Sequence, residues 1–275
     1  MNPLRDTIRG HVHRLVKAEA MDLSRPPGDP GLFGEASEAG VIHGDFSAML
    51  IGGVAALLTQ MLHPLALAGV WDHSDWRDDP GGRLARTARF IALTTYGATA
   101  AAEASLATVR RIHDRVTGML PDGTPYRAND PALLTWVHAV EADGFLRAHV
   151  AYREPGMPGP RQDRYLAEMA GLARRLGATD VPESRRALAG YFRAVRPQLR
   201  YDERTQTVAA TLLAEAGARD GLGVAIGQVL MTAGVELMQP WAAAMHGLGT
   251  PALRRPAIRA GAAATAGVLR WALSG

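Results

Sequence analysis

The sequence predicts an all-α protein, a multi-helix bundle of about 9 to 11 helices in one domain. Apolar residues recur at helical spacing in nearly every segment between loops, and no segment alternates as a half-buried strand does. With 275 residues, 47% of them hydrophobic, the chain can bury a sizeable core. Charged residues make up 21%, which is ordinary for a globular protein.

Prolines and glycines divide the first half of the chain. A Pro/Gly-rich stretch at 25–40 is too irregular for regular structure, and a polar loop is expected at 72–82. Between them, Pro64 is expected to break or bend an apolar helix just after His63. The helices expected here span 4–22, 46–62 and 83–97.

Local signals also mark the helices that follow. Gly97 and Gly118 are expected to end the helices before them, with a turn at 119–129. Asp130 is the expected N-cap of the next helix and Pro131 its first residue. The helices expected in this part span 98–118, 131–152, 161–176, 183–196, 203–218, 221–247 and 251–272.

Only one stretch, residues 46–70, is as long and apolar as a membrane span. It contains Thr59, Gln60, His63 and Pro64, so we interpret it as a buried central helix. The chain begins with a charged segment, which predicts no signal peptide and a cytoplasmic location.

Composition excludes several kinds of site. With no cysteine, disulfides, thiolate metal sites, covalent haem attachment and thiolate-ligated haem are all ruled out. If an iron porphyrin binds, histidine is its expected axial ligand, ahead of tyrosine and methionine. Lys17 is the only lysine, so 29 of the 30 basic residues are arginine, and no basic run suggests a nucleic-acid partner. Arginine suits planar anions such as carboxylates, although GC-rich coding DNA produces the same excess.

Sequence motifs exclude further enzyme classes. The chain contains no His-Glu-x-x-His, Glu-x-x-His, Gly-x-Ser-x-Gly or P-loop sequence. Nine histidines remain, and four of them, His63, His73, His113 and His138, lie in apolar or patterned segments. Taken singly, each fits a structural histidine. His73 lies between Asp72 and Ser74 in a predicted self-bonded loop, and His138 lies on a core face of its helix.

The surroundings of His113 distinguish it from the others. Arg110 and Thr117 are expected on its helix face, and the preceding helix carries Arg83 and Thr87, four residues apart, with Arg86 between them. Antiparallel packing of these two helices about Gly97 would bring the two sets together. One imidazole and several guanidinium groups match a b-type haem with its two propionates; two solvated amphipathic faces are the alternative.

Several segments resemble a known family in order and spacing. They include GDPGLFGEAS, LLTQMLHPLALAGVWDHSDW, DPGGRLARTARFIALTTYG, RRIHDRVTG, DPALLTWVHA and DRYLAEM. The family is the MpaB-like/rubber-oxygenase catalytic domain, which includes bacterial latex-clearing proteins and a fungal oxygenase of mycophenolic acid biosynthesis. The resemblance covers about residues 25–200, and a helical tail at 201–275 completes the expected single domain, 1–275.

The resemblance implies an all-α b-type haem protein that uses dioxygen, with globin-like helix packing around the cofactor pocket. The family's proximal histidine falls on His113, and its paired arginine and threonine fall on Arg83 and Thr87. The expected haem contacts are therefore His113 on the iron, with Arg83, Arg86, Thr87 and Arg110 around it. His63, His73 and His138 are the rival ligands.

The expected function is that of a haem b-dependent oxygenase or oxidase using dioxygen or peroxide on a small to medium apolar metabolite. Arg83 and Thr87 are its expected catalytic residues. Because the chain is shorter than the rubber oxygenases, polyisoprene is not the expected substrate. The alternative is a non-catalytic haem- or lipid-binding protein. Peripheral membrane contact could then involve the last helix, where Arg259 and Arg270 flank an apolar stretch. The sequence leaves the oligomeric state open.

Overall fold

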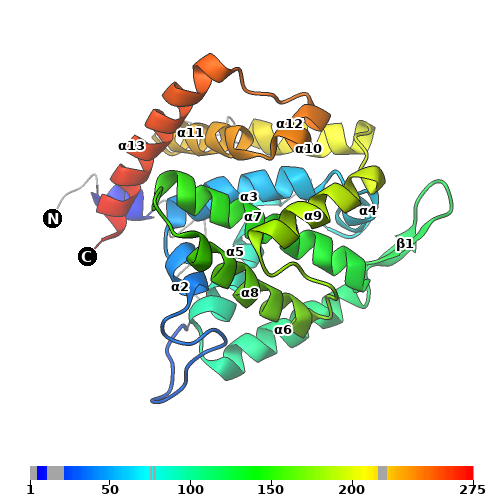
Figure 1. The fold of residues 1–275 in the computed structure, drawn as a ribbon, viewed down its shortest axis with the longest axis horizontal. Helices are drawn as coiled ribbons and strands as arrows, with labels where there is room; N and C mark the ends of the chain where they lie inside the picture. The colour runs from blue at the N-terminus through cyan, green and yellow to red at the C-terminus, as the bar shows by residue number, and fades with distance from the viewer. Residues whose placement is uncertain (1–4, 11–21, 75, 77–78, 216–221, 275) are drawn as a thin grey trace.

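A computed structural model describes residues 5–10, 22–74, 76, 79–215 and 222–274 (Figure 1). The described residues between 38 and 273 form twelve α-helices, α2 to α13, and one small β-hairpin. The all-α prediction is confirmed. There are more helices than expected because two predicted segments are each divided and one short helix was not predicted.

The elements follow one another along the chain in a simple order. They are α2 (Glu38–His43), α3 (Phe46–Gln60), α4 (Pro64–His73), α5 (Pro80–Tyr96), α6 (Thr99–His113), β1 (Thr117–Met119), β2 (Pro125–Arg127), α7 (Pro131–Tyr152), α8 (Gly159–Leu176), α9 (Arg185–Val195), η2 (Arg196–Gln198), α10 (Glu203–Glu215), α11 (Leu222–Leu237), α12 (Pro240–His246), η3 (Ala252–Arg254) and α13 (Arg255–Leu273).

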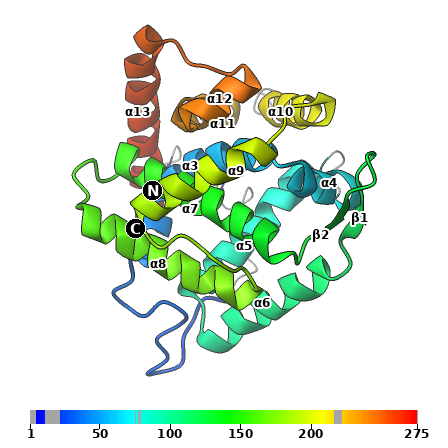
Figure 2. The same cartoon turned by 45° about the vertical axis from the view of Figure 1, so that its right-hand side comes forward.

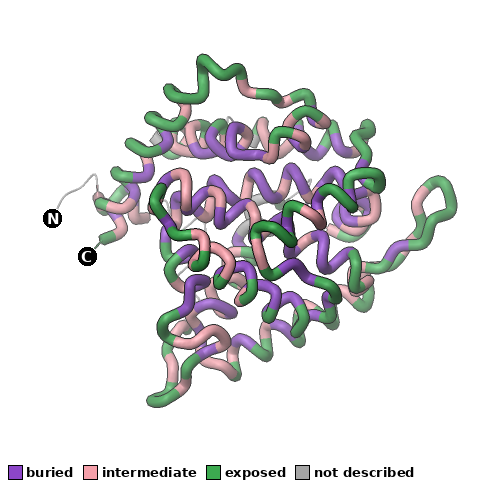
Figure 3. The backbone as a smooth tube through the Cα atoms, in the orientation of Figure 1, coloured by how far each residue is buried: buried purple, intermediate pink, exposed green. Residues whose placement is uncertain are grey.

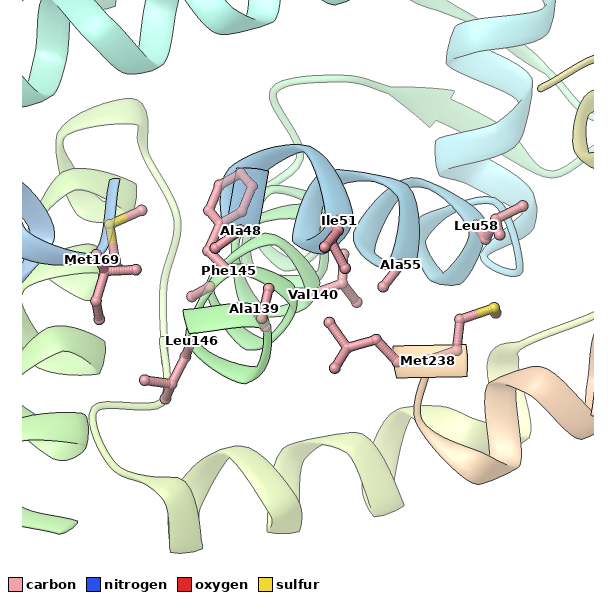
Figure 4. Packing of buried hydrophobic residues seen from close by; sticks show 14 of the residues in the cluster. Ala48, Ile51, Ala55, Leu58, Ala139, Val140, Phe145, Leu146, Met169 and Met238 are labelled. Carbon is pink, nitrogen blue, oxygen red and sulfur yellow. The ribbon is translucent and has the colours of Figure 1, made fainter. Parts of the chain in front are cut away.

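The centre of the molecule is the contact between α3 and α7. A Cβ built on Gly144 would lie 2.5 Å from the Gly52 carbonyl oxygen, so only glycine allows the two backbones to come this close. Apolar side chains from both helices, with Met238 beside them, fill the space around this crossing (Figure 4). The membrane-length stretch is thus largely core, as predicted.

Helices α3 and α4 meet at a sharp bend. Pro64 is at the start of α4 and His63 occupies its N-cap position, so the predicted break after His63 is confirmed. Across the described residues, no single helix is long and apolar enough to span a membrane. Only α3 and α4 together meet that test, and they are bent by 104° relative to each other.

Helices α5 and α6 form a helical hairpin below the core (Figures 1 and 2). The Asp79 carboxylate accepts a hydrogen bond from the Gly82 backbone N–H, so α5 begins three residues before the predicted start at Arg83. The turn at Gly97 connects α5 to α6, as predicted. This hairpin carries most of the predicted site residues.

Besides shifts of a few residues at helix ends, three larger predictions of helix extent were wrong. Helix α2 lies partly inside the predicted loop 25–40, because Ser37 accepts a hydrogen bond from Gly40 N–H and caps it. The predicted helix 221–247 is divided into α11 and α12, because Pro240 begins a new helix after Gln239.

The third wrong boundary concerns the end of α6. This helix ends at His113 rather than Gly118, and 117–127 forms an antiparallel hairpin that pairs Thr117 with Arg127 and Met119 with Pro125. The hairpin projects from the body and is largely exposed (Figure 3). Thr117 therefore lies in a strand and does not share a helix face with His113.

Candidate functional site

His113 is the last residue of α6 and is half-buried. Burial lowers the pKa of its imidazole, while Asn129 and Asp114 act in the opposite direction. The ring is therefore uncharged at neutral pH. Its Nδ1 is buried and has no hydrogen-bond partner among the described residues. An uncharged imidazole with an unpaired nitrogen has the properties of a metal ligand.

The basic residues predicted around His113 are exposed where the structure describes them. Arg110 lies one turn before His113 in α6, and its backbone carbonyl accepts a hydrogen bond from Asn129 Nδ2 at 3.1 Å. Arg86 lies 3.7 Å from the Asp79 carboxylate, and its side chain is 60% exposed. Thr87 is also exposed. The side chain of Arg83 lies outside the described part of the chain.

His138, on α7, is a rival ligand on which His113 acts electrostatically. Burial lowers the pKa of His138 to about 4, and the neighbouring His113 acts in the same direction, so the two rings lie within electrostatic range. The Nδ1 of His138 lies 3.9 Å from Oε2 of Glu141 and has no hydrogen-bond partner among the described residues. The structure therefore brings His113 together with one of its three rivals.

Glu141 is a functional candidate that sequence reasoning missed. Burial raises the pKa of its carboxyl to about 7. Its side chain is mostly buried, with 18% of it exposed. The signal in the sequence was a glutamate three residues after His138, a spacing that places both on one helix face. A carboxyl with this pKa can exchange a proton at neutral pH.

His63 and His73 are the other rival ligands, and Nδ1 of His63 is also buried without a hydrogen-bond partner among the described residues. The His63 ring lies 5.8 Å from the ring of Trp136, and burial lowers its pKa to about 4. His73 lies at the end of α4, where Nε2 is 3.1 Å from the Tyr126 hydroxyl. The expectation that His73 bonds within its own loop was wrong, because its partner lies in the β-hairpin.

The DHS sequence at 72–74 holds that hairpin against α4. The Tyr126 hydroxyl donates a hydrogen bond to the Asp72 carboxylate at 2.7 Å. A Cβ on Gly118 would lie 2.5 Å from the same hydroxyl oxygen, so the close packing of the Tyr126 ring requires glycine there. The conformation of the chain after His113 is thus fixed by residues from α4 and β2.

A second group of buried polar side chains surrounds His43. His43 lies between the hydroxyls of Thr95, 2.8 Å from Nδ1, and Tyr165, 3.1 Å from Nε2. Burial lowers the pKa of His43 to about 3, and burial, with a smaller contribution from Glu141, raises the pKa of Tyr165. With both ring nitrogens paired, His43 has the contacts of a structural histidine.

A separate hollow of about 140 Å³ lies between α7, α11, α12 and α13. Its lining includes Arg147, Glu236, Arg255 and Arg259, and the Glu236 carboxylate pairs with Arg259 at 2.9 Å. None of the predicted site residues lines it. Within the described ranges, no three acidic or histidine side chains are grouped closely enough to hold a bare metal ion.

These observations define an all-α protein in which one uncharged histidine, His113, ends α6 and another, His138, lies on the central helix α7. A family model described as "ER-bound oxygenase mpaB/B'/Rubber oxygenase, catalytic domain" matches residues 41–271. The chain belongs to this family and is an oxidoreductase of the oxygenase class. The match extends through the helical tail, well beyond residue 200. No curated protein and no solved structure shows a significant match.

Proposed function

We propose that the protein is a haem b-dependent oxygenase that acts with dioxygen or peroxide on a small to medium apolar metabolite, with His113 as the axial ligand. The observation that carries the proposal is the state of His113, an uncharged, half-buried ring at the end of α6. Membership of an oxygenase family supports it. The absence of cysteine leaves histidine as the expected axial ligand.

The residues around His113 fit a haem. A neutral imidazole can offer one nitrogen to iron while the other bonds to the protein. Arg110 and Arg86 are exposed guanidinium groups on the same helical hairpin and are suited to the two propionates. Arg83 and Thr87 are proposed to contact the haem or the substrate, and bound haem would supply the oxygen chemistry.

The protein's own groups would bind the substrate and exchange protons. Phe90 and Ile91 of α5 are only partly buried against the core, so they can offer apolar surface to a substrate. Glu141 is the group best suited to give or take a proton, since burial raises the pKa of its carboxyl to about 7. His138 lies next to it and can orient the carboxyl.

The experiment is haem reconstitution of the full chain and of matched histidine variants. The wild type should give a Soret band and a b-type pyridine haemochrome. His113→Gly should lose most of the haem and regain it with added imidazole, whereas His138→Gly should keep it. His246→Gly is the control, because His246, at the end of α12, is also buried but donates its Nε2–H to the Leu58 carbonyl oxygen, 2.8 Å away.

Two results would contradict the proposal. A wild-type protein that takes up no haem would exclude a haem-dependent function. A Soret band that survives in His113→Gly but is lost in His138→Gly would move the axial ligand to α7. Haem binding without any reaction with dioxygen or peroxide would favour the alternative, a non-catalytic haem-binding protein.

A further inference from the structure

Asn129 follows the β-hairpin and returns to the end of α6. Its Nδ2 donates two hydrogen bonds, to the Arg110 carbonyl oxygen at 3.1 Å and to Asp114 Oδ1 at 2.6 Å. Both acceptors lie within three residues of His113 on the same chain segment. The side-chain amide of Asn129 is therefore fixed against the last turn of the helix that carries His113.

The two hydrogen bonds also decide which way the amide points. Both acceptors are oxygens that cannot donate, one a backbone carbonyl and the other a carboxylate. Turning the amide over would place its own oxygen against these two oxygens and lose both bonds. The Asn129 oxygen, Oδ1, is thus directed away from Arg110 and Asp114.

Two buried atoms near each other lack partners. Asn129 Oδ1, an acceptor, has no hydrogen-bond partner among the described residues, and neither has His113 Nδ1. The Asn129 side chain acts on the His113 ring as a hydrogen-bonding neighbour and raises its pKa against the effect of burial. Because Asn129 is hydrogen-bonded to Arg110 and Asp114 on either side of His113 in the chain, its oxygen and the ring nitrogen lie in the same region without forming a hydrogen bond. A hydrogen bond between them would satisfy both atoms, and buried polar atoms are rarely left unpaired.

We propose that Asn129 is a positioning residue for His113: its amide oxygen accepts a hydrogen bond from the Nδ1–H of the imidazole. This bond fixes the tautomer, so that Nε2 is the unprotonated nitrogen and carries the lone pair. This inference rests on the proposed function only for the identity of the group that Nε2 would bind, a haem iron. Ligating histidines commonly donate their other ring N–H to a carbonyl or carboxylate in this way.

The β-hairpin explains how residue 129 reaches this position. Ala128 N–H donates to the Val116 carbonyl at 2.9 Å and continues the pairing of β1 with β2 up to Asn129. Tyr126, held by Asp72, anchors the same strand to α4. The hairpin and the DHS sequence thereby act through Asn129 on the orientation of the His113 ring.

The first test measures the tautomer of His113 directly in the full-length protein without haem. Long-range proton–nitrogen NMR of protein with ¹⁵N-labelled histidine reports which ring nitrogen carries the proton, and His113→Gln identifies the signal. The wild type should have the proton on Nδ1 at neutral pH. Asn129→Leu, which removes the acceptor, should shift the proton to Nε2. A wild-type ring protonated on Nε2, or no change in Asn129→Leu, would overturn the proposal.

Asp114→Asn is the matched control. It removes the charge at the helix end but leaves an oxygen for Asn129 Nδ2, so the Nδ1–H tautomer should persist. If Asp114→Asn changed the tautomer as Asn129→Leu does, the helix-end charge rather than the amide oxygen would set it, and the proposal would be wrong.

An exchanged pair keeps the test valid if Asn129→Leu does not fold. In Asn129→Asp combined with Asp114→Asn, the new amide can donate to the new carboxylate, which then faces the His113 ring. The proton should stay on Nδ1, and the pKa of His113 should rise above its wild-type value, because a carboxylate stabilises the imidazolium. An unchanged pKa would show that residue 129 does not contact the ring.

A second readout uses the haem-loaded protein. Loss of an outer-shell partner costs roughly 10- to 100-fold in affinity for the bound group, so Asn129→Leu should transfer its haem to an apo-globin acceptor faster by about that factor. Equal transfer rates would count against Asn129. A wild type that takes up no haem but holds its proton on Nδ1 would overturn the proposed function and not this pairing.

Discussion

Two faces of the central helix α7 have opposite characters. Toward α3, Gly144 and Val140 belong to a close-packed apolar contact in which the two backbones nearly touch. Another face carries a polar stripe at positions i, i+3, i+11 and i+14, formed by His138, Glu141, His149 and Tyr152. Both faces are largely buried, but only the α3 face is apolar and close-packed, as a protein core usually is.

The polar stripe differs from an ordinary core in two ways: it contains buried polar atoms without partners, and its ionisable groups have shifted pKa values. Nδ1 of His138, Nδ1 of His149 and the Tyr152 hydroxyl are buried with no hydrogen-bond partner among the described residues. The pKa of His138 is lowered to about 4 and that of Glu141 raised to about 7. Such exceptions are expected where a protein functions rather than where it only packs. The contrast shows that α3 and α7 hold the fold, while the proposed site draws on α6 and on the polar stripe.

The largest expected effect comes from breaking the α3 face. Gly144→Ala would place a Cβ 2.5 Å from the Gly52 carbonyl oxygen, and because the obstacle is backbone, the helices must separate. We expect a loss of about 3 kcal/mol or more in the free energy of unfolding, measured by urea denaturation. Gly53→Ala is the control, since its Cβ would meet only Phe145, at 3.8 Å. It should change stability by less than about 1 kcal/mol. Equal effects of the two substitutions would refute the close contact.

The next effect tests the polar stripe at high pH. The pKa of Glu141 rises from an ordinary 4.5 to about 7 on folding, so the folded state holds the proton more tightly than the unfolded state does. The associated stability is complete below pH 4.5 and is lost as the pH rises through about 7. Glu141→Gln should therefore stabilise the protein by about 2–3 kcal/mol near pH 8 and have little effect near pH 4. Thermal unfolding across this range checks it, and a gain that does not depend on pH would argue against a buried carboxyl.

His138 should produce the opposite pH dependence with a smaller effect. The folded-state pKa is about 4 against an ordinary 6.5, so the unfolded state binds the proton more tightly and stability falls as the pH drops through this window. His138→Gln removes this contribution and should be less acid-sensitive than the wild type by about 2 kcal/mol near pH 5. His43 and His63 remain and continue to titrate in both proteins. The quantity compared is therefore the slope of stability against pH in the variant and in the wild type. Identical slopes in variant and wild type would place His138 in solvent.

The smallest effect concerns the hairpin that leads from His113 to Asn129. Tyr126→Phe removes the hydrogen bond to Asp72 and should cost about 1 kcal/mol, with faster amide exchange in β1 and β2. Met119→Ala is the control, because Met119 is 71% exposed on the same hairpin and should leave both quantities nearly unchanged. Unaltered exchange in Tyr126→Phe would mean that Asp72 does not hold the hairpin.

The sequence predicted well wherever one residue acts on its own neighbours. Pro64 begins α4, Asp130 caps α7 and Gly97 ends α5, because each of these signals works within a single turn of backbone. The predicted end of α6 was wrong because the actual end depends on residues far from it in the sequence. The chain leaves the helix at His113 to pair β1 with β2, and that pairing depends on residues ten positions further on.

The sequence by itself determined the all-α class, the order of the helices, the family and the choice of His113, because periodicity and motif spacing are written along the chain. Only the tertiary structure decided which side chains accompany that histidine. His138 of α7 lies within electrostatic range of it, and Asn129 returns to the end of α6 through the hairpin. These contacts join residues that lie 15 or more positions apart, and their meeting depends on how helices and strands pack, which no local pattern encodes.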